Sequence, residues 1–294
     1  MLAILRRRWF MVALSIAAFL IAIDYLSTGL QGIAVEGPLI VSSLGVALGW
    51  IVLTSSVLIA RSRLRVHETD GFVLDYRRDR RLTSTTAVGV GLIALGTSVD
   101  STSVLALQFA RYVVPGCYAA GYALIAVAAL VLAKAMSHEE QLGRSNRRIH
   151  GRHLLVTGGV GIAVGVLPYL FETVPGVFGD IPHVALFEIQ AASTAVIGVA
   201  LLASAMRKLG SPGPLAAVGL GFLAIALGRA IEGVWSYVLT GFGLVRVCLV
   251  LIGLGYVAIG VGAGIVAART KSRSAPRLPD DSHQPAEVEG LWAR

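Results

Sequence analysis

An arginine and a glutamate stand three residues apart inside an apolar stretch of this sequence. Arg229 and Glu232 belong to the segment GRAIEGVWSY, at the end of an apolar run that begins at Leu215. On a helix, residues with this spacing share a face and can form an ion pair. Charged groups inside an apolar segment also mark binding sites and solute paths. The pair is therefore the first candidate for a functional site.

Six further ionisable residues lie in apolar segments at a similar depth. At about 1.5 Å per helical residue, all eight fall roughly 22 to 33 Å from the same end of their segments. They form a charged layer of five carboxylates and three arginines: Asp24, Asp100, Arg111, Glu172, Glu188, Arg229, Glu232 and Arg246. Apart from Lys134 at the last position of its segment, the opposite halves of the segments contain no charged residue.

Two interpretations of this charged layer differ in where its side chains point. Charged groups near a helix end reach lipid headgroups at low cost, which accounts readily for Arg111, Glu172 and Arg246. Alternatively, the side chains line a water-filled vestibule, because a charge in hydrocarbon costs at least about 2.5 to 3.5 kcal/mol and usually faces the bundle interior. The vestibule accounts better for the residues that follow uninterrupted apolar sequence: Asp24, Asp100, Arg229 and Glu232.

The composition identifies the class of protein that must position these residues. The chain has 294 residues, of which 55% are hydrophobic and 14% charged, and its mean hydropathy is +0.76. Soluble domains carry about a quarter charged residues. The sequence therefore predicts a membrane protein, with the lipid bilayer as its surroundings and the cell membrane as its location.

Eight apolar runs are long enough to cross the bilayer, which takes about 20 residues. The sequence thus predicts an all-α, polytopic transmembrane bundle over residues 1–270. The segments are expected near 9–29, 38–60, 84–107, 112–134, 154–172, 184–206, 214–235 and 243–268. Seven segments are the alternative, because the break between the third and fourth runs is itself fairly apolar.

Basic residues fall in alternate connections, which predicts the orientation of the bundle. Short cytoplasmic loops retain Lys and Arg, so an even number of segments places both termini in the cytoplasm. This pattern also explains the net charge of +8 without nucleic acid as a partner.

The cytoplasmic parts outside the bundle are small. In the loop 62–82, Asp70 and Gly71 stand between two short alternating stretches, which predicts a β-hairpin with a two-residue turn. The Pro-rich segment 271–294 is expected to be a disordered cytoplasmic tail.

Weak internal repetition suggests two four-helix units. AVGVG at Ala87 reappears as AVGLG at Ala217, and Asp100 finds a counterpart in Glu232. Repeats with four helices each would have the same orientation and be related by an axis along the membrane normal.

Catalytic signatures do not favour an enzyme. The sequence contains no HExxH, GxSxG or Walker motif, and it indicates no cofactor or metal site. A thiol nucleophile at Cys117 or Cys248, with Arg111, Arg229 or Arg246 beside it, is the remaining catalytic hypothesis.

Three functions fit a multi-pass protein with an outward-facing charged layer. The favoured one is transport or binding of a small solute or ion. The alternatives are a sensor or receptor module and an accessory subunit of a membrane complex; nothing in the sequence indicates an oligomeric state. The apolar inner halves of the segments argue against a continuous polar path for a transported ion.

Overall fold

A computed structural model describes residues 8–31, 36–62, 73–102, 110–141, 147–173, 183–207, 213–238 and 242–272. Side chains are described for slightly shorter ranges, which are 8–30, 44–62, 80–100, 113–135, 152–171, 185–206, 213–234 and 244–269. All the described residues are helical. The helices are α2 (Arg8–Gln31), α3 (Glu36–Ser62), α4 (Val73–Thr102), α5 (Ala110–Gln141), α6 (Arg147–Thr173), α7 (His183–Arg207), α8 (Gly213–Val238) and α9 (Phe242–Ser272).

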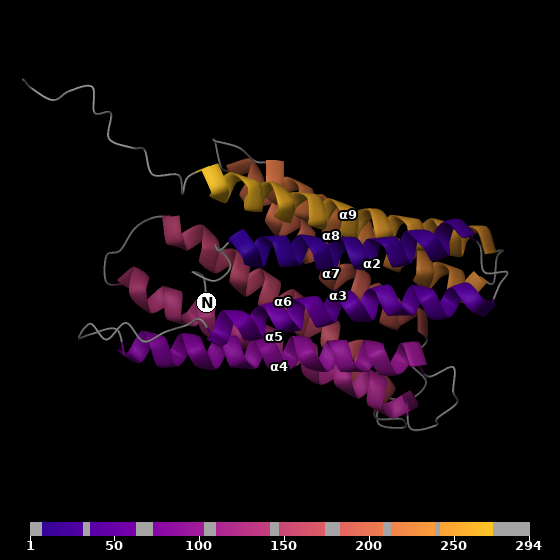
Figure 1. Ribbon diagram of the computed structural model, residues 1–294, viewed down its shortest axis with the longest axis horizontal. Coiled ribbons are helices and arrows are strands. Elements are labelled where there is room, and N and C mark those ends of the chain that lie inside the picture. The colour runs from indigo at the N-terminus through magenta and orange to yellow at the C-terminus, as the bar shows by residue number, and fades with distance from the viewer. Residues whose placement is uncertain are drawn as a thin grey trace, which may run out of the picture.

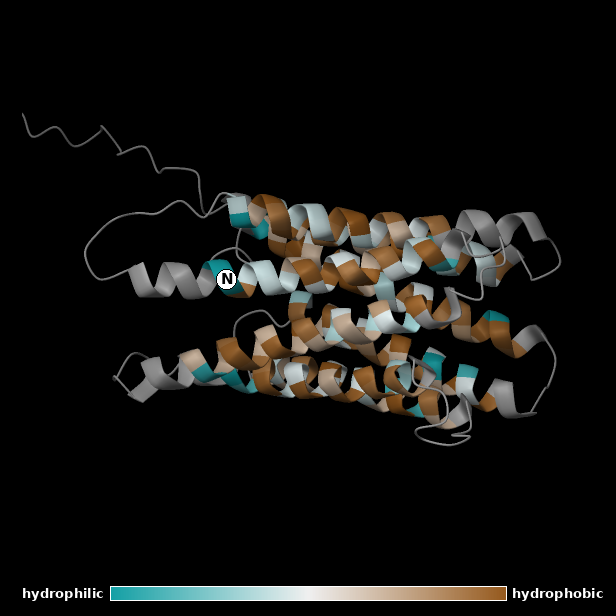
Figure 2. Cartoon of the chain, turned by 90° about the horizontal axis from the view of Figure 1, so that it is seen from below, coloured by the Kyte–Doolittle hydropathy of each residue, from teal (hydrophilic) through white to brown (hydrophobic). Residues whose placement is uncertain are grey.

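Each of the eight helices is long and apolar enough to cross a membrane. Their apolar parts cover 19 to 26 residues, close to the roughly 20 residues that a bilayer requires. Figure 2 shows hydrophobic residues along the middle of the bundle. Large apolar side chains also cover its outer surface, as at Ile23 and Val199, which a lipid environment satisfies and water does not. The predicted all-α polytopic bundle is confirmed, and the part of the chain that the structure describes contains eight such helices, as the eight-segment interpretation expects.

The helices run side by side and form a closed ring. Every helix packs against its neighbours in the chain, and α9 packs against α2. Within the described residues, these eight pairs account for all substantial contacts between helices. The helices alternate in direction, so α2 begins and α9 ends at the same end of the bundle (Figure 1).

Two helix hairpins of the ring pack through equivalent residues. A Cβ on Gly89 of α4 would lie 2.7 Å from the carbonyl oxygen of Gly121 of α5, and one on Gly221 of α8 would lie 2.5 Å from that of Gly255 of α9. Glycine at these positions therefore allows the backbones to approach. In each hairpin, isoleucines one turn further along cover the glycines: Ile93 and Ile125 in the first, Ile225 and Ile259 in the second.

This correspondence supports the predicted duplication, in a corrected register. The sequence IALG begins at both Ile93 and Ile225, and the same register pairs Asp100 with Glu232. The match between AVGVG and AVGLG is two residues out of this register and does not describe the packing. The hairpin of α4 and α5 thus corresponds to that of α8 and α9, as two four-helix repeats would require.

The predicted β-hairpin is wrong in its second arm. Residues from Val73 onward belong to α4, where the hairpin requires a strand. A two-stranded hairpin is marginally stable on its own, whereas the segment RRDRRL extends an apolar helix that already exists. The Asp70-Gly71 turn, the first arm and the tail 273–294 lie outside the described residues.

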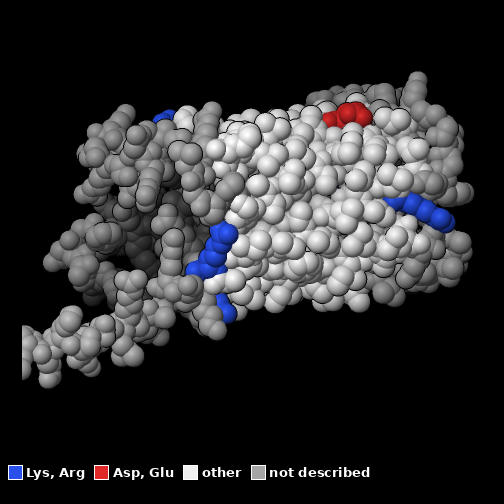
Figure 3. Space-filling model, turned by 90° about the horizontal axis from the view of Figure 1, so that it is seen from above, with Lys and Arg blue, Asp and Glu red and all other residues white. Residues whose placement is uncertain are grey.

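Basic residues collect at the end of the bundle where α2 begins. Seven residues with described side chains lie at this end of the apolar parts of their helices: Arg8, Arg61, Arg80, Arg81, Lys134, Arg152 and Arg269. Figure 3 shows basic side chains toward both ends of one face, with most of the described surface between them uncharged. The expectation that the end with the termini is cytoplasmic remains a prediction from these charges.

Candidate functional site

The ring surrounds a partly open cavity of about 390 Å³, which we call the ring cavity. Seven of the eight helices contribute described residues to its wall, and α4 contributes none. Because both halves of the chain contribute residues to the wall, the cavity lies between the two halves. It is the candidate functional site.

The wall of the ring cavity is mostly apolar and has a polar region toward one end. Leu14, Gly158 and Ile259 lie toward the end of the bundle that carries the termini. Toward the other end are Arg229 and Gln190, the former about 24 Å along α8 from Gly213. The remaining polar or aromatic lining residues are Trp50, Tyr122, Tyr169, Ser193, Thr194, Phe222 and Tyr256.

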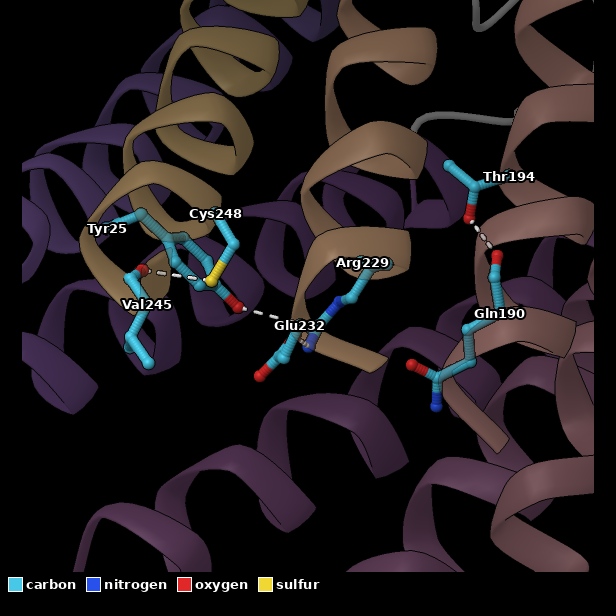
Figure 4. A network of polar contacts seen from close by, with 7 residues as sticks. All are labelled: Tyr25, Gln190, Thr194, Arg229, Glu232, Val245 and Cys248. Carbon is cyan, nitrogen blue, oxygen red and sulfur yellow. Dashed lines mark hydrogen bonds and ion pairs between the residues drawn. The ribbon is translucent and has the colours of Figure 1, made fainter. Parts of the chain in front are cut away.

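Arg229 is the single charged residue among the described residues of the wall. Its Nη1 donates to Glu232 Oε2 at 2.6 Å, which is the ion pair expected from their spacing. Its Nη2 lies 3.4 Å from the hydroxyl of Tyr25 on α2, a longer and weaker contact. Both charged side chains are about one quarter exposed, at 26% and 25%. In Figure 4, Arg229 projects between Tyr25 and Gln190.

Two stacked tyrosine pairs occupy equivalent places in the two repeats. Tyr25 of α2 stacks on Tyr256 of α9, with ring centroids 5.9 Å apart and an angle of 10° between the planes. Tyr169 of α6 stacks on Tyr122 of α5 at 5.7 Å and 17°. Tyr122 and Tyr256 each follow one of the glycines at the close helix contacts. The aromatic part of the cavity wall therefore follows the internal symmetry of the ring.

The charge breaks this symmetry. Thr97 of α4 is the counterpart of Arg229 in the repeat register, one residue after IALG in each case. The hydroxyl of Tyr118 donates to Thr97 Oγ1 at 3.1 Å, and Thr97 in turn donates to the carbonyl oxygen of Ile93. The first repeat thus places a neutral hydrogen-bonded pair where the second places a guanidinium group facing the cavity.

The structure does not bring the predicted charged layer together around the ring cavity. Asp24 is buried between α2 and α3, where its Oδ2 accepts a hydrogen bond from the backbone N–H of Val46 at 3.1 Å. Arg246 is exposed near a helix end, as the interfacial interpretation expects. Glu188 is exposed near a helix end as well, and so is Asp100, for which the vestibule was the better explanation. The side chains of Arg111 and Glu172 lie outside the described residues.

The aromatic residues of the wall were missed in the sequence because they carry no charge. The signal that marks them is the recurrence of Gly-Tyr followed by isoleucine three residues later, at Gly121 and at Gly255. At both places, the pattern coincides with a close helix contact at the glycine and a stacked pair at the tyrosine. Gln190 has no comparable signal.

The cysteines do not belong to the wall of the ring cavity. The Cys248 thiol donates to the carbonyl oxygen of Val245 at 2.9 Å, within its own helix, and Cys117 packs near Gly96. Among the described residues, no three side chains of the types that bind metal ions come together.

Comparison with known proteins adds no functional information. The chain matches no protein-family model, and neither a curated protein nor a solved structure matches it. Its function must therefore be argued from the ring cavity itself.

Proposed function

We propose that the protein binds a small, mostly apolar solute in the ring cavity, as the binding step of transport across the membrane. The observation that carries this proposal is the cavity itself, with its apolar wall and one guanidinium group facing it. Ligand sites have volumes of about 300 to 1,000 Å³ and apolar walls with a few polar groups that orient the ligand. The ring cavity fits this description in both respects.

The cost of placing Arg229 in the bundle supports a functional role for that residue. An arginine within a membrane-spanning segment costs at least about 2.5 kcal/mol, and such residues usually face a pathway or a binding site. A purely structural ion pair could form on any face of α8, but in this pair Arg229 lines the cavity. The position therefore favours contact with a solute.

The apolar inner part of the cavity favours a particular class of solute. An ion would need polar groups along its whole path, and the inner halves of the apolar segments contain no charged residue except Lys134 at the edge of one of them. A lipophilic molecule needs none, because apolar walls solvate it. We therefore propose an apolar solute in place of the ion that the charged layer first suggested.

The internal symmetry favours transport over the receptor and subunit alternatives. In several transporter folds, parallel repeats are related by an axis along the membrane normal, and solutes bind near the midplane at the repeat interface. The ring cavity lies at such an interface. A receptor would bind the same solute without moving it, so measurement of flux distinguishes the two.

Binding can be tested with a neutral, apolar fluorophore and a pair of matched variants. A Cβ at Gly158, in the cavity wall, meets no atom within 4 Å, so Gly158→Leu places its side chain into open cavity space. Gly213 has equally open surroundings but is not in the wall, and Gly213→Leu is the control.

We expect 1-aminoanthracene to bind the protein in lipid nanodiscs, and Gly158→Leu to weaken binding about tenfold or more, since it removes much of the free volume. Gly213→Leu should bind like the wild type. Equal binding by both variants would place the probe in the surrounding lipid and contradict the proposal. Efflux of the probe from proteoliposomes then separates transport from binding alone.

A further inference from the structure

The ion pair at the polar end of the ring cavity is electrically neutral. Glu232 accepts a 2.6 Å hydrogen bond from Arg229, so its carboxylate compensates the guanidinium charge at contact distance. Glu232 itself is not part of the cavity wall, whereas Arg229 is. A ligand in the cavity therefore meets N–H donors whose positive charge is already balanced by a carboxylate outside the wall.

From this arrangement we infer that the ring cavity selects an uncharged, planar, lipophilic molecule with a carbonyl-type acceptor, and that Glu232 sets the preference for an uncharged ligand. The inference rests on the proposed binding function. A carboxylate ligand would leave water for an apolar cavity in which Arg229 already has a partner, and its repulsion by Glu232 would offset much of the attraction. A neutral acceptor loses far less on leaving water.

The polar groups of the wall favour an acceptor on the ligand. A guanidinium group has five N–H donors and no acceptor, and the two contacts to Glu232 and Tyr25 use one on each terminal nitrogen. Gln190, on the opposite side of Arg229 from Tyr25 in Figure 4, adds an amide with two donors. A carbonyl oxygen can accept from this set without bringing a charge.

The aromatic residues favour a planar ligand. Tyr122, Tyr169 and Tyr256 belong to the two stacked pairs and all line the cavity. Stacking in an offset or edge-to-face arrangement is favourable between flat ring systems. The wall beyond them, toward Leu14 and Ile259, is apolar and accommodates a hydrocarbon substituent.

Three naphthalene derivatives of nearly equal size test the charge and the acceptor separately. 2-Acetylnaphthalene is neutral with a carbonyl group, 2-naphthoate is an anion, and 2-ethylnaphthalene is neutral with no acceptor. Each would compete with 1-aminoanthracene for wild-type protein in nanodiscs, with free concentrations corrected for partition into empty nanodiscs. We expect 2-acetylnaphthalene to bind at least about tenfold more tightly than 2-naphthoate and severalfold more tightly than 2-ethylnaphthalene.

Two variants assign the preference to the ion pair. Glu232→Gln removes the balancing charge, so we expect the affinity for 2-naphthoate to rise about tenfold or more and the order of ketone and acid to invert. Arg229→Gln removes the guanidinium donors, and the difference between the ketone and the ethyl compound should shrink. The wild-type comparison needs no variant and remains decisive if either substitution prevents folding.

The possible outcomes separate the selectivity from the binding function. Tighter binding of 2-naphthoate than of 2-acetylnaphthalene by the wild type would overturn the inference while leaving binding in the cavity intact. An unchanged order in folded Glu232→Gln protein would overturn the role of Glu232. If the wild type showed no probe binding that Gly158→Leu weakens, this result would instead contradict the proposed function.

Discussion

Replacing Glu232 by glutamine should destabilise the bundle by leaving Arg229 without its counter-charge. The pair has a 2.6 Å charge-assisted hydrogen bond, and both side chains are about one quarter exposed. For charges about 4 Å apart, an effective dielectric constant near 20 gives about 4 kcal/mol. Hydration of the exposed parts reduces this attraction, so we expect Glu232→Gln to cost about 1 to 3 kcal/mol.

The same reasoning predicts that removing both charges costs less than the two single changes together. Arg229→Gln with Glu232→Gln leaves no uncompensated charge at the cavity, so part of the loss should be restored. In a domain of 150 to 250 residues, 1 kcal/mol shifts the Tm by about 2 to 4 °C, and the shift here should lie toward the lower value.

The assay is a double-mutant cycle on the Tm in detergent, with Tyr25→Phe as a control. The contact from Arg229 to Tyr25 is 3.4 Å long, so this control should change the Tm little. If each charge substitution costs under about 1 kcal/mol and the two effects add, the side chains behave as an exposed pair. Such a result would refute the argument that the pair is held in the bundle interior.

Three further predictions concern the fold around the site. Gly221→Val should lower the Tm by several degrees, because its Cβ would lie 2.5 Å from a carbonyl oxygen of α9, whereas Gly213→Val has open space and should change little; equal Tm values would contradict the close packing. Asp24→Asn should keep or raise the Tm in a thermal scan, because a buried amide costs less than a buried carboxylate; a clear loss would show that the charge of Asp24 is needed. A reporter fused after Arg277 should be cytoplasmic and one inserted near Gly176 external; the same side for both would contradict the orientation.

The sequence could predict the helices because the bilayer imposes their length and polarity. About 20 apolar residues are needed per crossing, and the eight runs satisfied this condition independently of any tertiary contact. The structure of the loop before α4 was harder to predict, because an Asp-Gly pair between alternating residues is typical of a hairpin turn. Whether the residues after Val73 extend a helix depends on the apolar segment that follows them. A turn pattern of a few residues contains no information about that segment.

The candidate site was predictable only where it depends on one helix. The ion pair of Arg229 and Glu232 follows from their spacing on α8. Counting residues gives the depth of a charge but not the direction it faces around the bundle. Asp24 faces α3 and Arg246 is exposed, so these residues lie at a similar depth without lining the same cavity.

The cavity itself depends on contacts between distant parts of the chain. The stack of Tyr25 on Tyr256 forms because α9 closes the ring against α2, and nothing near either residue in the sequence encodes that closure. The repeated Gly-Tyr pattern of α5 and α9 is the one local signal, and its meaning becomes clear once the two helix hairpins are seen to pack alike.

The most direct test of the proposed function is to map where an apolar solute binds. A naphthyl ketone carrying a diazirine would be photolysed with the protein in lipid nanodiscs and the labelled residues identified by mass spectrometry. We expect labelling of cavity residues such as Tyr122, Tyr169 and Tyr256, and its loss in Gly158→Leu but not in Gly213→Leu. Labelling confined to outward-facing residues such as Val199 and Leu220, and unaffected by Gly158→Leu, would contradict binding inside the ring.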